Sequence, residues 1–178
     1  NNESVNVENH EFDFPRQLVD KGPGKINYSL ADFISPDKDW MGMFAVTTGK
    51  GIESVISEFE KDHDDYRIIM IKAIADRLAE AFAEKLHQMI RIDYWGYSTE
   101  KNISIEQLIK EKYNGIRPAP GYPACPSHEE KDKIWEILDV EKEVEITLTE
   151  SRAMYPAASV SGWYFSHPNS VYFSVLNN

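Results

Sequence analysis

The sequence has little cysteine, a deficit of positive charge and no long apolar run. Its single cysteine, Cys125, excludes an intrachain disulfide and a cysteine-cluster metal site, and it suits a reducing compartment, so we expect a cytoplasmic protein. The 19 Lys and Arg against 30 Asp and Glu give a formal net charge of −11, which disfavours binding to a phosphate backbone. No apolar run approaches the roughly 20 residues of a membrane-spanning helix. We therefore predict neither nucleic acid nor a membrane as a partner.

Several catalytic signatures are also missing. The chain has no glycine-rich dinucleotide fingerprint, no P-loop, no nucleophile elbow and no His-Glu-x-x-His zinc motif, so we predict no catalytic residue and no resident metal ion. Cys125 lacks the surroundings of a catalytic cysteine. The first residue is Asn1, and no signal-peptide pattern follows it. We expect a trimmed chain or a piece of a longer protein.

The 178 residues are enough for one domain, with a hydrophobic fraction of 42% that is typical of a globular protein. Residues 1–25 are polar and end near Gly22-Pro23-Gly24, which predicts an extension or linker. Residues 26–178 are predicted to form a single module. Its first strand is expected over 41–48, a short apolar run that is bounded by glycines.

The middle of the chain has helical periodicity. A first helix is predicted over about 52–61, and a long one from Asp64 to about Tyr94. We expect one stripe of the long helix to face the core. This stripe comprises Ile71, Ile74, Ala75, Leu78, Phe82 and Met89. The opposite face carries Asp76, Glu80, Glu84 and His87, interleaved with Ala73, Ala79 and Ala83.

The last third contains shorter elements. We predict helices over about 104–112 and from a Ser127–Glu130 capping box to about 139, and strands over 144–148, 159–165 and 170–176. Residues 129–150 hold nine acids and three bases, a net charge of −6, whereas residues 151–178 carry only Arg152. Helices in the middle with strands at both ends predict an α+β fold with a mostly antiparallel sheet, a central long helix and a few shorter helices.

The segment 117–126 is the most unusual in the chain, because four of its ten residues are prolines. Proline fixes φ and lacks an N–H, so this segment is predicted to be a stiff loop that holds a ligand at little entropic cost. Arg117 offers a planar fork for a carboxylate or phosphate, Gly121 allows close approach, and Tyr122 offers a ring face. The alternative is a rigid surface connection without a ligand.

Two further patterns have competing interpretations. Glu84 and His87 have the spacing of metal ligands, and Glu60 and His63 repeat it, which allows a di-metal carboxylate site. The alternative is a solvated helix face, which charged residues one turn apart more often form. A lone Glu80 between alanines could also bind an amine. Trp163 and Phe165 are expected on one face of a strand and Tyr164 on the other, which favours core packing over a shared pocket.

Three segments together resemble a known family. They are His63-Asp-Asp-Tyr66 with the following Ala75–Glu84, then Gly115–Pro126, and then Leu148-Thr-Glu-Ser151 with Ser159–Pro168. In this order and spacing they look like the activation domain of cobalamin-dependent methionine synthase, an α+β module that binds S-adenosylmethionine. The resemblance runs from about Tyr28 to Val175.

The resemblance implies a role in reactivation. In this family the module presents S-adenosylmethionine to an oxidised, inactive cobalamin while flavodoxin or a flavodoxin-like reductase supplies an electron, and methyl transfer restores the methylated cofactor. This chain would then act as part of a methyltransferase. Because flavodoxins are acidic like this chain, we expect the reductase to engage through the cobalamin partner.

The resemblance also implies the site residues. Arg117 is expected to pair with the ligand carboxylate, Glu80 to face its polar groups and Tyr122 to line the site. Backbone atoms around Pro118, Ala119 and Gly121 are expected to hold the adenosyl portion, and Val160, Tyr172 and Phe173 to wall the site from neighbouring strands. A zwitterionic sulfonium needs a cation, a carboxylate and a ring face, and its methyl transfer needs positioning more than acid–base groups.

The chain also departs from the family. The family domain extends further at both ends, and its N-terminal portion supplies an aspartate that nothing here matches. No Asp-x-His-x-x-Gly cobalamin motif is present, so the cobalamin must come from another domain or chain. The alternative function is therefore a non-catalytic partner or sensor subunit that keeps the fold and binds S-adenosylmethionine weakly or not at all.

Overall fold

The computed structural model describes residues 3–18, 22–100 and 103–176. Within them the strands pair as three two-stranded antiparallel ladders, β1–β2, β3–β6 and β4–β5. The α+β class and the antiparallel pairing are as predicted. The elements in chain order are β1 (Ser4–Val7), β2 (His10–Asp13), the 3₁₀ helix η1 (Leu30–Phe33), β3 (Gly42–Thr47), α1 (Ile52–Lys61), α2 (Asp65–Met89), the π-helical turn η2 (Ile90–Tyr94), α3 (Ile105–Ile109), α4 (Glu130–Leu138), α5 (Val140–Val144), β4 (Thr147–Leu148), β5 (Met154–Tyr155) and β6 (Ser159–Tyr164).

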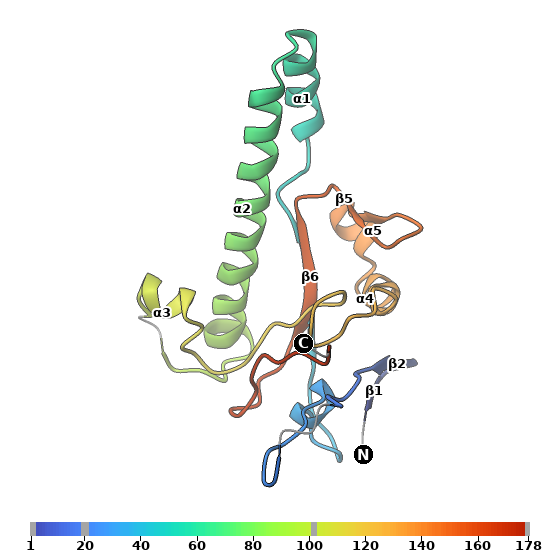
Figure 1. Ribbon diagram of the computed structural model, residues 1–178, viewed down its shortest axis with the longest axis vertical. Helices are drawn as coiled ribbons and strands as arrows, with labels where there is room; N and C mark the ends of the chain where they lie inside the picture. Colours follow the sequence, from blue (N-terminus) through green and yellow to red (C-terminus); the bar gives the residue numbers. More distant parts are fainter. Residues whose placement is uncertain (1–2, 19–21, 101–102, 177–178) are drawn as a thin grey trace.

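The β3–β6 ladder is the centre of the molecule. α2 runs beside it, and the α1–α2 pair extends past its end (Figure 1). Because successive strand residues point to opposite faces, the two sides of the ladder enter different clusters. Tyr164 packs with Phe44 beneath α2, whereas Trp163 and Phe165 enter the larger core on the other side. The predicted division of these aromatic residues is therefore confirmed.

The long helix begins where the sequence predicts. The carboxylate of Asp64 accepts a hydrogen bond from the backbone N–H of Arg67 at 2.9 Å and caps the first turn. α1 likewise occupies the predicted range and is followed by a tight turn in which the N–H of Asp64 donates to the carbonyl of Phe59. A local capping signal thus places the start of α2, whereas α1 begins after Gly51 without a side-chain cap.

Of the stripe of α2 that was predicted to face the core, only Ala75 is buried. The large apolar side chains Ile74, Leu78 and Phe82 are 52%, 54% and 46% exposed. Alanines let a helix approach a neighbouring sheet closely, and the aromatic side chains of the ladder fill the remaining space. The buried residues of α2 are Ala75, Ala79, Ala83 and His87.

Residues 4–17 are part of the folded core, so the prediction of an extension or linker is wrong for this described part. β1 and β2 form a hairpin, and Phe12 and Phe14 are fully buried against Trp163. Alternation over only four residues per strand, among polar neighbours, gave too weak a signal to find this hairpin.

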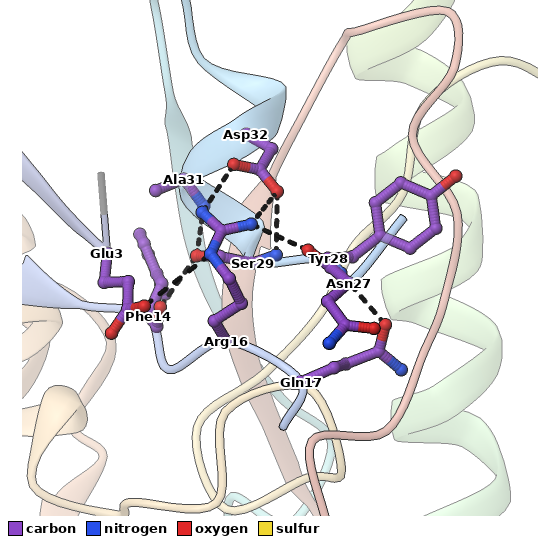
Figure 2. A network of polar contacts seen from close by, with 9 residues as sticks. All are labelled: Glu3, Phe14, Arg16, Gln17, Asn27, Tyr28, Ser29, Ala31 and Asp32. Carbon is purple, nitrogen blue, oxygen red and sulfur yellow. Dashed lines mark hydrogen bonds and ion pairs between the residues drawn. The ribbon is translucent and has the colours of Figure 1, made fainter. Parts of the chain in front are cut away.

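A network of hydrogen bonds and ion pairs connects the N-terminal residues 4–17 to η1 (Figure 2). Arg16 forms a two-pronged ion pair with Asp32, with nitrogen–oxygen distances of 2.6 and 2.7 Å. Ser29 donates to the carbonyl of Phe14 at 2.7 Å and caps η1. Burial raises the pKa of Asp32, but the hydrogen bonds from Arg16 and from the backbone of Ser29 outweigh it and leave that pKa below its usual value.

Three other predictions need correction. Ser127 does not cap α4, because its hydroxyl accepts from the N–H of Glu129, while Glu130 pairs with Lys133. Residues 140–144 are helical, so only Thr147–Leu148 of the strand predicted over 144–148 is a strand. Residues 170–176 form no strand, because their backbone groups bond to loop and side-chain partners. None of the described helices is long and apolar enough to span a membrane.

Candidate functional site

A pocket of about 250 Å³ lies where the proline-rich loop meets α2, β6 and the segment 172–173. It collects side chains that are up to 93 positions apart in the sequence, from Glu80 to Phe173. The lining includes eight of the nine predicted site residues: Glu80, Arg117, Pro118, Ala119, Tyr122, Val160, Tyr172 and Phe173. Glu111, Pro123 and Ala124 also line it and were not predicted.

The ninth predicted residue, Gly121, shapes the loop without lining the pocket. Its φ of +87° lies in the left-handed region that favours glycine, and a Cβ at this position would collide with the imidazole of His128. The N–H of Gly121 donates to the carbonyl of Cys125 at 2.8 Å, and the N–H of Cys125 donates to the carbonyl of Tyr122 at 2.9 Å. This turn presents Tyr122 at the pocket.

The loop is fixed to the central ladder at its other end. Ile116 and Phe165 exchange two backbone hydrogen bonds of 3.0 Å, and the N–H of Trp163 donates to the carbonyl of Pro118 at 2.9 Å. Gly162 makes this approach possible, because a Cβ there would collide with the carbonyl oxygen of Pro118 and lie 3.3 Å from the Cα of Ala119. The floor of the pocket is therefore a rigid backbone surface.

Arg117 supplies the positive charge of the pocket. Its backbone N–H donates to the hydroxyl oxygen of Tyr172 at 3.0 Å, and its side chain is mostly buried. Its guanidinium lies 3.3 Å from a carboxylate oxygen of Glu84 and 3.8 Å from one of Glu80. Burial lowers the pKa of Arg117, but Tyr172 and Glu84 outweigh this and raise it overall, so the side chain stays a cation.

Behind Arg117 lies a buried polar cluster that the sequence did not predict. Glu84 accepts a hydrogen bond from the hydroxyl of Tyr113 at 3.0 Å, and Arg91 stacks over the Tyr113 ring at 3.6 Å. His87 is fully buried and stacked on Tyr164, with ring centroids 5.1 Å apart. Glu84 and His87 are therefore not a solvated face.

These contacts also bear on the metal-site alternative. Glu84 is committed to Arg117 and Tyr113, and the Nε2 of His87 lies 3.1 Å from the hydroxyl of Tyr97. In the described part of the chain, no group of three or more His, Cys, Asp or Glu side chains is placed to hold a metal ion. The Glu-x-x-His spacing here reflects two residues that share the buried side of one helix.

Glu111 adds a second carboxylate to the pocket lining. Burial raises its pKa above the usual value, and the nearby charge of Glu84 acts in the same direction, although Arg117 opposes both. Glu111 follows the short helix α3 in a segment without a motif, so only the tertiary structure brings it beside Arg117.

The wall formed by Tyr172 and Phe173 depends on the N-terminal segment. The side-chain amide of Gln17 donates to the carbonyl of Ser174 at 2.8 Å, and the N–H of Val175 donates to the carbonyl of Pro123 at 2.8 Å. The ring of Phe173 lies 5.8 Å from that of Tyr28. These contacts hold an irregular segment in place of the predicted strand.

Cys125 lies beside the pocket floor but is not a candidate nucleophile. It is fully buried, and burial, with a smaller effect of Glu130, raises the pKa of its thiol to about 12. A thiol with that pKa is protonated at neutral pH and reacts poorly.

The pocket thus combines one cation, Arg117, with two carboxylates, Glu80 and Glu111, and with the rings of Tyr122 and Phe173. Such a set can recognise a small zwitterion that carries both a carboxylate and cationic groups. No acid–base pair or nucleophile is arranged in it, so the geometry favours binding and positioning.

Comparisons with known proteins agree with this description. Residues 1–177 match the family described as vitamin B12 dependent methionine synthase, activation domain. The structure is similar to a crystal structure of the MetH reactivation domain bound to AdoHcy, with a TM-score of 0.89 and 56% sequence identity. The match covers 93% of this chain and 52% of that chain, so the present sequence spans about half of its length.

Proposed function

Because this chain belongs to the activation-domain family of vitamin B12-dependent methionine synthases, we propose that its pocket binds S-adenosylmethionine and presents the methyl group to a cobalamin. The observation that carries the proposal is that eight of the predicted residues line one pocket. The chain that forms this pocket is 56% identical in sequence to a reactivation domain whose structure was determined with AdoHcy bound. The cobalamin belongs to a partner domain, and an electron would come from a flavodoxin-like reductase.

The charges of the pocket suit this ligand. S-adenosylmethionine carries a carboxylate, an ammonium and a sulfonium, and its net charge is therefore positive by one. Glu80, Glu111 and Arg117 together carry a formal net charge that is negative by one. The net charge of the ligand therefore offsets that of the pocket, and each charged group of the ligand has an oppositely charged group available in the pocket.

Each residue has a role that follows from its position. Arg117 pairs with the ligand carboxylate through its planar fork, and Glu80, which is half-exposed at the pocket edge, accepts from the ammonium. The backbone at Pro118 and Ala119 supports the adenosyl portion, because Gly162 lets this rigid surface lie against β6. The exposed ring of Tyr122 supplies a face for the sulfonium.

The contribution of this chain to the reaction is to orient the methyl group. A reduced cobalamin supplies the nucleophile that accepts a methyl group from a sulfonium. In this proposal the rigid floor and the stiff proline-rich loop limit the motion of the sulfonium in the pocket. No proton has to move in such a transfer, which agrees with the lack of an acid–base pair in the pocket.

Replacing Arg117 tests the assignment. We expect Arg117→Ala to weaken binding of S-adenosylmethionine by about tenfold to hundredfold, because a charged hydrogen bond to the carboxylate is lost. Arg152→Ala removes an arginine that pairs with Asp132 away from the pocket and should leave affinity unchanged. Titration calorimetry of the two variants decides, and equal affinities would contradict the role of Arg117.

A further inference from the structure

The carboxylate of Glu84 lies behind Arg117 and does not line the pocket. One of its oxygens, Oε2, accepts from the hydroxyl of Tyr113 at 3.0 Å and from Nη2 of Arg117 at 3.3 Å. The other oxygen, Oε1, lies 3.7 Å from Nη1 of Arg91. Three side chains from different parts of the chain therefore converge on this one carboxylate.

Arg91 explains why the carboxylate is held firmly. Its side chain is fully buried in η2, and its nitrogens donate no hydrogen bond to any other described residue. Its Cζ lies over the ring of Tyr113, 3.6 Å from the ring centroid, and Glu84 is the carboxylate paired with it. A buried cation that loses its counterion is costly, so Glu84 is confined between Arg91 and Tyr113.

We propose that Glu84 is a positioning residue that fixes the Arg117 guanidinium for the carboxylate of an amino-acid-bearing nucleoside ligand. The inference rests on the proposed function. Glu84 holds the Nη2 side of the guanidinium from behind, while the Nη1 side extends toward Glu80 at the pocket edge. A bidentate contact between guanidinium and carboxylate requires a fixed plane, and this arrangement supplies it.

Glu80 and Glu84 thus have different tasks although they are one helical turn apart. Glu80 lines the pocket and its side chain is 50% exposed, whereas that of Glu84 is 21% exposed and its partners lie in the interior. Glu80 can meet a ligand directly. Glu84 acts only through Arg117.

Two ligands separate positioning from general support of the fold. S-adenosylhomocysteine carries the amino-acid carboxylate, and 5′-methylthioadenosine has the nucleoside and sulfur but lacks the amino-acid portion. We expect Glu84→Gln to weaken binding of S-adenosylhomocysteine by about tenfold or more and that of methylthioadenosine by less than about twofold. Tyr113→Phe removes a bond to Glu84 without changing charge and should cause a smaller loss with the same selectivity.

The matched control is Glu58→Gln, an exposed position on α1, which should alter neither affinity. Calorimetric affinities of the parent chain report on the proposed function, and those of the variants report on Glu84. An unchanged affinity of Glu84→Gln for S-adenosylhomocysteine would overturn the inference. So would a gain in that affinity, or equal losses for the two ligands.

A second measurement needs no ligand. Nitrogen-15 NMR of the Arg117 guanidinium, assigned by its loss in Arg117→Lys, reports rotation about the bonds from Cζ to the terminal nitrogens. We expect slow rotation in the parent and in Glu58→Gln, and faster rotation in Glu84→Gln. Equal rotation rates would contradict the positioning role even if the parent bound neither nucleoside.

Discussion

His87 illustrates at the scale of one residue how an ionisable group becomes part of a core. Its ring is stacked on Tyr164 at an interplanar angle of 18°, and its Nε2 lies 3.1 Å from the hydroxyl of Tyr97. Burial, with smaller effects of Arg91 and Arg117, lowers the pKa of His87 from 6.5 to about 2. The imidazole is therefore neutral in the folded chain at physiological pH.

This shift predicts a pH dependence of stability. Below pH 6.5 the unfolded chain binds a proton that the folded chain does not, so the contribution of His87 is complete above 6.5 and is lost as pH falls toward 2. Between pH 6.5 and 5 the loss amounts to at most about 2 kcal/mol. Urea unfolding at pH 7 and pH 5 should show that the free energy of unfolding decreases less for His87→Gln than for the parent when the pH is lowered. Equal decreases would contradict the assignment.

Gly162 and Ser161 are neighbours on β6 with opposite expected sensitivities. A Cβ at Gly162 would collide with the carbonyl oxygen of Pro118, so Gly162→Ala should displace the proline-rich loop and destabilise the fold by about 1–3 kcal/mol. Ser161→Ala removes a buried hydroxyl that has no hydrogen-bond partner in the described structure and should be nearly neutral. Thermal unfolding of both variants tests this. A neutral Gly162→Ala would show that the loop is not fixed to β6 as described.

At the scale of elements, α2 separates what the sequence predicts from what it does not. Its start is correctly predicted from the sequence, because Asp64 caps the first turn through a local hydrogen bond. Its buried face depends on a neighbour that is distant in the sequence, because the aromatic rings of β3 and β6 pack against Ala83 and His87. Ile74, Leu78 and Phe82 of the predicted apolar stripe are therefore about half exposed, whereas its Ala75 is buried.

Substitutions on the two faces of α2 should differ accordingly. Ala83→Leu forces a larger side chain against Phe44 and Tyr164 and should cost about 1–3 kcal/mol. Leu78→Ala on the exposed face should cost less than about 1 kcal/mol, because a half-exposed leucine creates no closed cavity. Chemical unfolding measures both values. A larger cost for Leu78→Ala would place the apolar stripe in the core after all.

Eight of the nine residues that were predicted for the site line one pocket. The proline-rich loop could be predicted from its own residues, since its prolines and Gly121 determine its shape. The family resemblance added Glu80, Val160, Tyr172 and Phe173 to the prediction. Glu84, Arg91, Glu111 and Tyr113 were not predicted as members of the site, because nothing local marks side chains that come together only when α2 meets the loop. The same limit explains the missed hairpin, whose strands are short and polar.

At the scale of the whole molecule, the acidic stretch and the pocket are built mainly on different elements. The acidic stretch 129–150 contributes −6 of the net −11 and includes α4, which packs through Ile134 on the Trp163 side of the central ladder. α2 covers the other side and contributes Glu80 to the pocket. The pocket also depends on both ends of the chain, because Gln17 and Tyr28 support the segment 172–174. The pocket therefore depends on contacts between the N-terminal and C-terminal parts of the described residues.

The most direct test of the central claim is a calorimetric titration of the chain with S-adenosylmethionine and S-adenosylhomocysteine. The account predicts saturable one-to-one binding of both ligands below millimolar concentration, with competition between them for one site. An absence of heat with either ligand at millimolar concentration would contradict the claim. It would favour instead a partner or sensor subunit that has kept the activation-domain fold without its ligand.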